Sequence, residues 1–164
     1  MKKILSILLV FAFLFSLSSC VLVPSYSGNE LLKILESRGY EYTVELDLET
    51  DHQGVIGYVY GSKEETGDEI YYIYCEGFSS ANAIFRYLKS KRNAEISEFK
   101  MKIEKVQFML DSDDVSAADK GKYYEEYVIL KEQLEEVQGY NCGRGYNVVW
   151  YGTKQALIDI RLGE

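Results

Sequence analysis

Histidine and proline are almost absent from this sequence, which has one of each, His52 and Pro24. Histidine is the commonest metal ligand and the usual acid–base catalyst near neutral pH. His52 lies in the polar loop ETDHQG, where a solvated turn residue is the simpler interpretation. No GxSxG motif accompanies it, so the sequence offers no positioned serine for a Ser-His-Asp arrangement. We therefore expect no catalytic residue and no metal site.

Motifs for cofactors and ions are also lacking. The segment GYNCGRGYN (139–147) has three glycines around Arg144, but it follows an expected helix and precedes an expected strand. Phosphate-binding glycine loops have the opposite order, so we interpret it as a loop. The segment DSDDVSAADKGK matches a calcium loop only in its first residues, because Val115, Ser116 and Lys122 stand where that loop needs other residues. We expect an interhelical loop there, and no cofactor.

Positive charge is scarce as well. Lysine and arginine number 18 against 26 aspartates and glutamates, which gives a net charge of −8. Nucleic-acid binding depends on clustered basic side chains that displace counterions. The composition therefore argues against a nucleic-acid partner.

The first twenty residues have the three zones of a secretory signal. A short cationic patch, Lys2 and Lys3, precedes an uncharged and mainly apolar run from Ile4 to Leu17, and small residues follow. This run has 14 residues, fewer than the roughly 20 that a membrane-spanning helix needs. We expect a signal peptide over residues 1–19 and not a permanent transmembrane helix.

The segment Leu17-Ser18-Ser19-Cys20 resembles the lipobox of bacterial prolipoproteins. That resemblance implies lipid attachment to the Cys20 sulfur and cleavage between Ser19 and Cys20. It also implies a protein held by its acylated cysteine in the cell membrane or outer membrane, facing outside the cytoplasm, with residues 20–27 as a short tether. Ordinary secretion and an uncleaved anchor are the alternatives.

With Cys20 lipidated, Cys75 and Cys142 remain as an even pair. They could form a disulfide in an oxidising compartment, or stay as a buried strand residue and a loop thiol. No CxxC motif occurs, so a zinc ribbon or a thioredoxin-like redox pair is not expected. Loss of Lys2 and Lys3 leaves 16 basic and 26 acidic side chains, a net charge of −10.

Residues 28–164 are expected to form a single α+β domain, a length that suits one core. Alternation in YEYTVELDL and the Tyr-, Ile- and Val-rich runs after it predict a three-strand antiparallel meander at 40–48, 55–62 and 69–76, with a C-terminal strand at 146–152. Apolar residues at helical spacing predict helices at 30–39, 80–93, 95–110, 123–137 and 153–160. The expected fold is an antiparallel sheet of about four strands with helices packed on one face. The run GYNVVWYGTKQAL resembles small uncharacterised bacterial exported proteins, a resemblance that implies no activity.

Tyrosine is the abundant residue, with 15 copies, many of them on expected strands. A tyrosine ring is rigid and apolar with a polar tip, which suits recognition of a protein, a peptide or a glycan. Tyrosine is also favoured in strands for packing reasons alone. We expect any binding face to include Tyr58, Tyr60, Tyr72 and Tyr74.

The function expected from these features is a non-enzymatic binding or protein-interaction domain tied to the bilayer through Cys20. One alternative is a small hydrolase or metal-dependent enzyme, in which acidic residues would converge on His52. The other is a structural or assembly factor of the envelope, with an exposed apolar or aromatic patch and no pocket.

Overall fold

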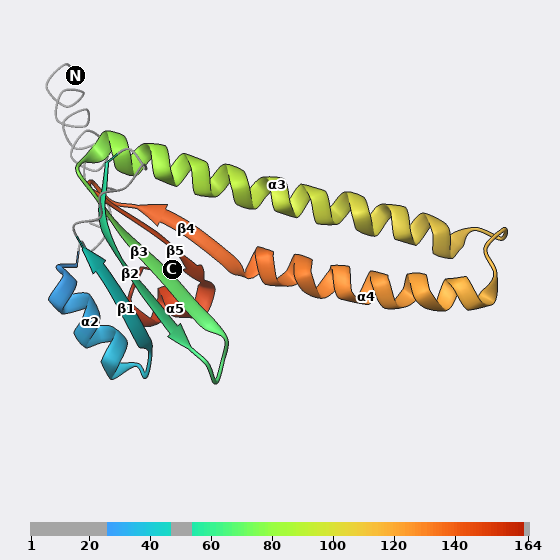
Figure 1. Ribbon diagram of the computed structural model, residues 1–164, viewed down its shortest axis with the longest axis horizontal. Helices are drawn as coiled ribbons and strands as arrows, with labels where there is room; N and C mark the ends of the chain where they lie inside the picture. Colours follow the sequence, from blue (N-terminus) through green and yellow to red (C-terminus); the bar gives the residue numbers. More distant parts are fainter. Residues whose placement is uncertain (1–25, 47–53, 163–164) are drawn as a thin grey trace, which may run out of the picture.

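A computed structural model describes residues 26–46 and 54–162. Along the chain, the elements are α2 (Gly28–Ser37), β1 (Glu41–Leu46), β2 (Val55–Lys63), β3 (Asp68–Cys75), α3 (Phe78–Asp111), α4 (Ala117–Gly139), β4 (Tyr140–Arg144), β5 (Val148–Thr153) and α5 (Lys154–Asp159). Figure 1 shows a twisted sheet with a long helical hairpin, α3 and α4, extending well beyond it. The α+β class is confirmed.

The sheet is antiparallel with the strand order β1-β2-β3-β5-β4. The meander β1–β2–β3 and the strand β5 were expected, whereas β4 makes a fifth strand in the glycine-rich segment that we had interpreted as a loop. Gly143 pairs with Trp150 of β5, and a Cβ atom at residue 143 would lie 2.6 Å from the indole ring. Glycine therefore leaves room for the tryptophan here, and the pairing with β5 makes this segment a strand.

The helices α2 and α5 cover one face of the sheet and build the main core. Leu31 and Leu35 of α2 and Leu157 of α5 pack against residues of β2, β3 and β5, namely Val59, Ile70, Tyr72, Val148 and Trp150. The ends of these helices are as expected from the sequence. Gly39, just beyond α2, has a φ of +78°, which glycine adopts readily, and the Thr153 hydroxyl accepts a hydrogen bond from the Ala156 amide at 3.3 Å.

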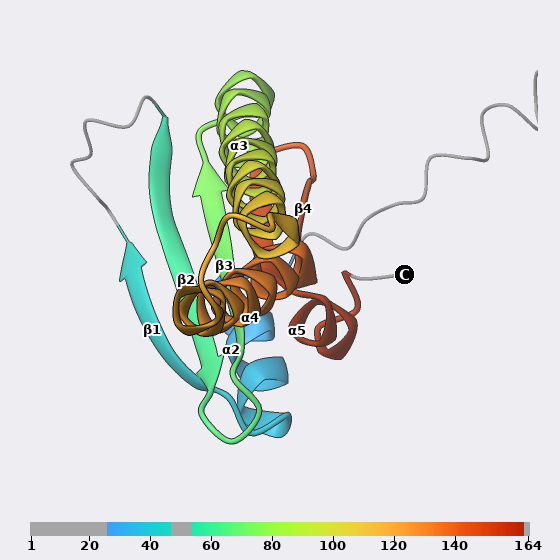
Figure 2. The ribbon, with the colours of Figure 1, turned by 90° about the vertical axis from the view of Figure 1, so that its right-hand side faces the viewer.

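The first half of α3 lies on the opposite face. Ala81, with Ile84, Phe85 and Leu88 half-buried around it, packs against Cys75 of β3 and Val149 of β5. The prediction of helices on one face therefore holds for α2 and α5 but not for α3. Figure 2 shows the hairpin nearly end-on, with β1 on one side of it and α5 on the other.

The hairpin has its own core. Ile103 and Val106 of α3 meet Leu130 and Leu134 of α4, with half-buried side chains around them, among them Ile96, Phe99 and Tyr127. We had expected two helices, ending and restarting near Asn93, where the structure has one helix of 34 residues. The segment contains neither glycine nor proline at that point, and one apolar stripe continues through it. No helix among those the structure describes is long and apolar enough to cross a membrane.

Candidate binding face

Three tyrosines and three carboxylates share the face of β1, β2 and β3 that lies opposite α2. Tyr60 and Tyr71 are direct cross-strand partners, and Tyr58 lies two residues along β2 on the same side. The neighbouring carboxylates belong to Glu41, Glu45 and Glu69. We call these six residues the tyrosine face.

Helix α3 covers this side of the sheet further along, where Ile73 and Val149 pack against it. Tyr71 is 37% exposed, Tyr58 and Tyr60 are half-buried, and Glu41 and Glu45 are exposed. The tyrosine face is therefore accessible beside the helix that covers the rest of this side.

The other two expected binding residues lie on the opposite face. Tyr72 is completely buried under α2 and α5, where its hydroxyl accepts a hydrogen bond from the Tyr26 amide at 3.1 Å. Tyr74 packs edge-on against Tyr72, with ring centroids 5.3 Å apart. These two rings belong to the core, so the four tyrosines do not form one binding face.

The rings of Tyr60 and Tyr71 contact each other, with centroids 4.6 Å apart. The Tyr60 hydroxyl donates a hydrogen bond of 2.8 Å to one oxygen of Glu69, and the Tyr140 hydroxyl of β4 donates to the other oxygen. Glu69 is thus held between two phenols, and it fixes the orientation of the Tyr60 ring. Such locked aromatic rings lose little conformational entropy when a partner packs on them.

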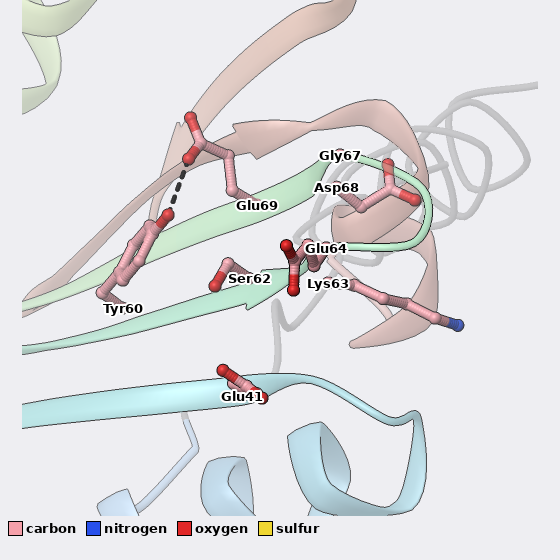
Figure 3. A pocket seen from close by; sticks show the side chains of 8 residues that line it. All are labelled: Glu41, Tyr60, Ser62, Lys63, Glu64, Gly67, Asp68 and Glu69. Carbon is pink, nitrogen blue, oxygen red and sulfur yellow. Dashed lines mark hydrogen bonds between the residues drawn. The ribbon is translucent and has the colours of Figure 1, made fainter.

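A hollow of about 420 Å³ opens beside Tyr60 at the β2–β3 turn, lined by Glu41, Tyr60, Ser62, Lys63, Glu64, Gly67, Asp68 and Glu69. Figure 3 shows the Lys63 ammonium pointing away from Glu41 and Glu69. Four carboxylates line the hollow, and its one lysine holds its ammonium away from two of them. The hollow and the tyrosine face beside it are therefore negatively charged. The electrostatic preference is therefore for a cationic group.

The carboxylates also keep these phenols protonated. The pKa of Tyr60 is raised, chiefly by its hydrogen bond to Glu69, and the pKa of Tyr58 is raised in the same way by Glu45. For Tyr71, burial is the main cause of its raised pKa, with the Glu69 charge second. Tyr58 and Tyr60 therefore stay protonated to a higher pH than a free tyrosine, as hydrogen-bond donors to Glu45 and Glu69.

In this structure Cys75 and Cys142 are both free thiols. Cys142 on β4 pairs with Tyr151 of β5, which pairs with Tyr71 of β3, and Cys75 lies four residues further along β3. Two strand spacings of about 4.8 Å and four steps of about 3.4 Å separate the Cα atoms by about 17 Å. A disulfide needs less than about 7 Å.

The remaining candidates from the sequence are Cys20 with its cleavage site, His52, the acidic segment after α3 and Arg144. Cys20, with its cleavage site, and His52 lie outside the described residues. Within residues 26–46 and 54–162, no group of three His, Cys, Asp or Glu side chains could hold a metal ion. The acidic segment after α3 is an interhelical loop, as expected, with Ser116 capping α4 by accepting from the Asp119 amide at 3.2 Å. Arg144 lies 4.5 Å from the centre of the Phe78 ring.

Four residues of the tyrosine face were not expected from the sequence, namely Tyr71, Glu41, Glu45 and Glu69. Because side chains alternate along a strand, Tyr71 lies on the same side of β3 as Glu69 and on the opposite side from Tyr72. The sequence therefore held one signal for this face. The register that brings Tyr71 opposite Tyr60 and Glu45 opposite Tyr58 depends on how three strands align, which no local pattern specifies. Comparison with protein-family models, with curated proteins and with solved structures finds no match to this chain.

Proposed function

We propose that this protein is a lipid-anchored lipoprotein of the bacterial envelope whose folded domain binds a positively charged segment of another protein. The anchor is Cys20, which carries the lipid outside the cytoplasm after cleavage between Ser19 and Cys20. The binding surface is the tyrosine face. The single observation that carries the binding role is an accessible sheet face on which three tyrosine rings are surrounded by carboxylates.

The chemistry of this face favours lysine- or arginine-containing peptides. A cation over a tyrosine ring gains about 0.5–1 kcal/mol at an exposed site, with Arg the more frequent donor. Carboxylates beside the rings add charge complementarity, which governs specificity and association rate more than affinity. Binding of this kind requires no bond to be made or broken, and the proposal assigns the domain no catalytic step.

The anchor is tested by metabolic labelling with radioactive palmitate. We expect label on the full-length chain in its bacterial host and none on Cys20→Ala, because the cysteine sulfur is the proposed acceptor. Persistence of the label in the variant would show that the lipobox assignment is wrong, whatever the domain binds.

The binding face is tested by fluorescence anisotropy with labelled arginine-rich and glutamate-rich decapeptides. We expect binding of the arginine-rich peptide only, weakened by salt because the charges are exposed. Tyr71→Ser should weaken it about five-fold, the equivalent of about 1 kcal/mol.

Tyr42→Ser is the matched control, because Tyr42 has the same 37% exposure but lies on the opposite side of the sheet, where its hydroxyl donates to Glu36 at 2.6 Å. Equal loss in both variants would place the site elsewhere. Equal binding of the glutamate-rich peptide would contradict the charge argument.

A further inference from the structure

The side of α3 turned away from α4 carries a regular stripe of exposed residues. Its members recur at alternating intervals of four and three, which places them on one side of a helix, and they are Tyr87, Lys91, Ala94, Glu98, Met101, Lys105 and Phe108. We call this set the outer stripe. The residues that α3 uses against α4, such as Ile103 and Val106, lie on the opposite side of the helix.

The outer stripe holds large apolar side chains that nothing described covers. Tyr87 is 65% exposed, Met101 63% and Phe108 73%. Figure 1 shows α3 along the margin of the molecule, with α4 and the sheet on its other side. With Ala94 completing the series, an apolar residue occurs at every seventh position, which is one of the two apolar positions of a heptad repeat.

The charges of the outer stripe are complementary to those of a second copy in one orientation. Along α3 they alternate as Lys91, Glu98 and Lys105, and all three are exposed. A second copy packed in parallel would place like charges opposite one another, Lys on Lys and Glu on Glu. An antiparallel copy centred on Met101 brings Glu98 within one residue of the partner's Lys105, and this contact occurs twice because the pairing is reciprocal.

The same register also fits the apolar side chains together. With Met101 opposite its own copy, Phe108 lies opposite the partner's Ala94, so that a large side chain meets a small one on both sides of the axis. Glu98 already pairs with Lys102 of its own helix at 2.7 Å. Both side chains of that pair are more than half exposed, so it contributes little and leaves Glu98 accessible.

We propose that the outer stripe is a self-association surface, on which α3 packs antiparallel against α3 of a second copy with Met101 on the two-fold axis. The contact goes beyond the proposed peptide binding and uses none of its residues. With Met101 on the axis, the two copies of α3 overlap from residue 91 to residue 111, because α3 ends at Asp111, and Tyr87 lies outside the overlap. The overlap is about 30 Å long and about 10 Å wide, or about 300 Å² per partner. This is well below a standard interface of about 800 Å² per partner, so we expect weak association.

Cysteine cross-linking of the full-length chain in membranes tests the contact. Met101→Cys should give an oxidised dimer in at least ten-fold higher yield than Tyr124→Cys, which is equally exposed at 62% but lies on α4. The unsubstituted chain gives the background from its own cysteines. Equal yields from the two variants would overturn the proposal.

The orientation is tested by two further combinations. Glu98→Cys expressed together with Lys105→Cys should cross-link more than Glu98→Cys by itself, whereas a parallel dimer would give the reverse. On the Met101→Cys background, Lys105→Glu should lower the yield several-fold, and adding Glu98→Lys should restore it because the reciprocal pairs are re-formed. Failure of this restoration would contradict the register, and circular dichroism checks that the variants fold. None of these changes touches the tyrosine face, so cross-linking and peptide binding succeed or fail independently.

Discussion

Tyrosine hydroxyls in this acidic protein are paired repeatedly with carboxylates. The hydroxyls of Tyr60 and Tyr140 both donate hydrogen bonds to Glu69. The Tyr40 hydroxyl donates a hydrogen bond of 3.0 Å to Asp159, which connects the start of β1 to α5. Hydrogen bonds to charged groups contribute more than neutral ones, about 1.5–3 kcal/mol where they are shielded from water. The abundance of tyrosine is thus partly structural, which is why only some of these rings can serve as a binding surface.

Tyr74 differs, because its buried hydroxyl has no hydrogen-bond partner among the described residues. We predict that Tyr74→Phe raises the free energy of unfolding by about 1 kcal/mol, since it removes an unsatisfied buried polar group. Urea denaturation measures the effect. Tyr60→Phe is the control and should lower stability by about 1 kcal/mol, because it breaks the bond to Glu69. A comparable loss in both variants would indicate that the Tyr74 hydroxyl has a partner.

At the scale of elements, the hairpin and the sheet are held by separate clusters. The hairpin core is formed by side chains of α3 and α4 alone, namely Ile103, Val106, Leu130 and Leu134. The sheet is held by two other clusters, one around Tyr72 and one around Val149. Two helices bury only one side of each other, so the four hairpin core residues keep 5–8% of their surface exposed, whereas six strand residues keep 1% or less. Such a projecting unit can open without unfolding the sheet.

We therefore predict that Leu134→Ala destabilises the hairpin selectively. The cavity should cost about 2–4 kcal/mol, and amide hydrogen exchange should accelerate in the distal parts of α3 and α4 while β3 and β5 keep their protection. Val149→Ala, in the sheet core, should instead accelerate exchange throughout. Uniform acceleration by Leu134→Ala would show that the hairpin and the sheet unfold together.

For the whole molecule, buried acids that stay protonated make stability depend on alkaline pH. Burial raises the pKa of Cys75 from 9.0 to about 11 and that of Tyr74 from 10.0 to about 12. Burial and a carboxylate partner also raise the pKa values of Tyr40 and Tyr140. In each case the native state favours the protonated form. Its contribution to stability is complete below the ordinary pKa and is lost as pH rises towards the raised one.

We predict that the urea midpoint is constant from pH 7 to about 9 and falls steeply between about pH 9 and 12. Cys75→Val should reduce the first part of this fall and Tyr74→Phe the later part, because each removes one ionisable group from the core. Tyr146→Phe, at a ring that is 75% exposed, should change nothing. A midpoint independent of pH up to 12 would contradict this account.

Local patterns in the sequence were sufficient for α2, β1, β2, β3, β5 and α5, because hydrophobic period and end residues such as Gly39 and Thr153 act within one element. They failed at β4, where pairing with β5 makes Gly143 a strand residue, and at Asn93, where the apolar stripe continues through one long helix. Only the tertiary structure decided which tyrosines of different strands share a side of the sheet, how far Cys75 lies from Cys142, and that Tyr87, Met101 and Phe108 are exposed. Each depends on strand register or on which helix face is covered, and both are set by contacts between residues far apart in the chain.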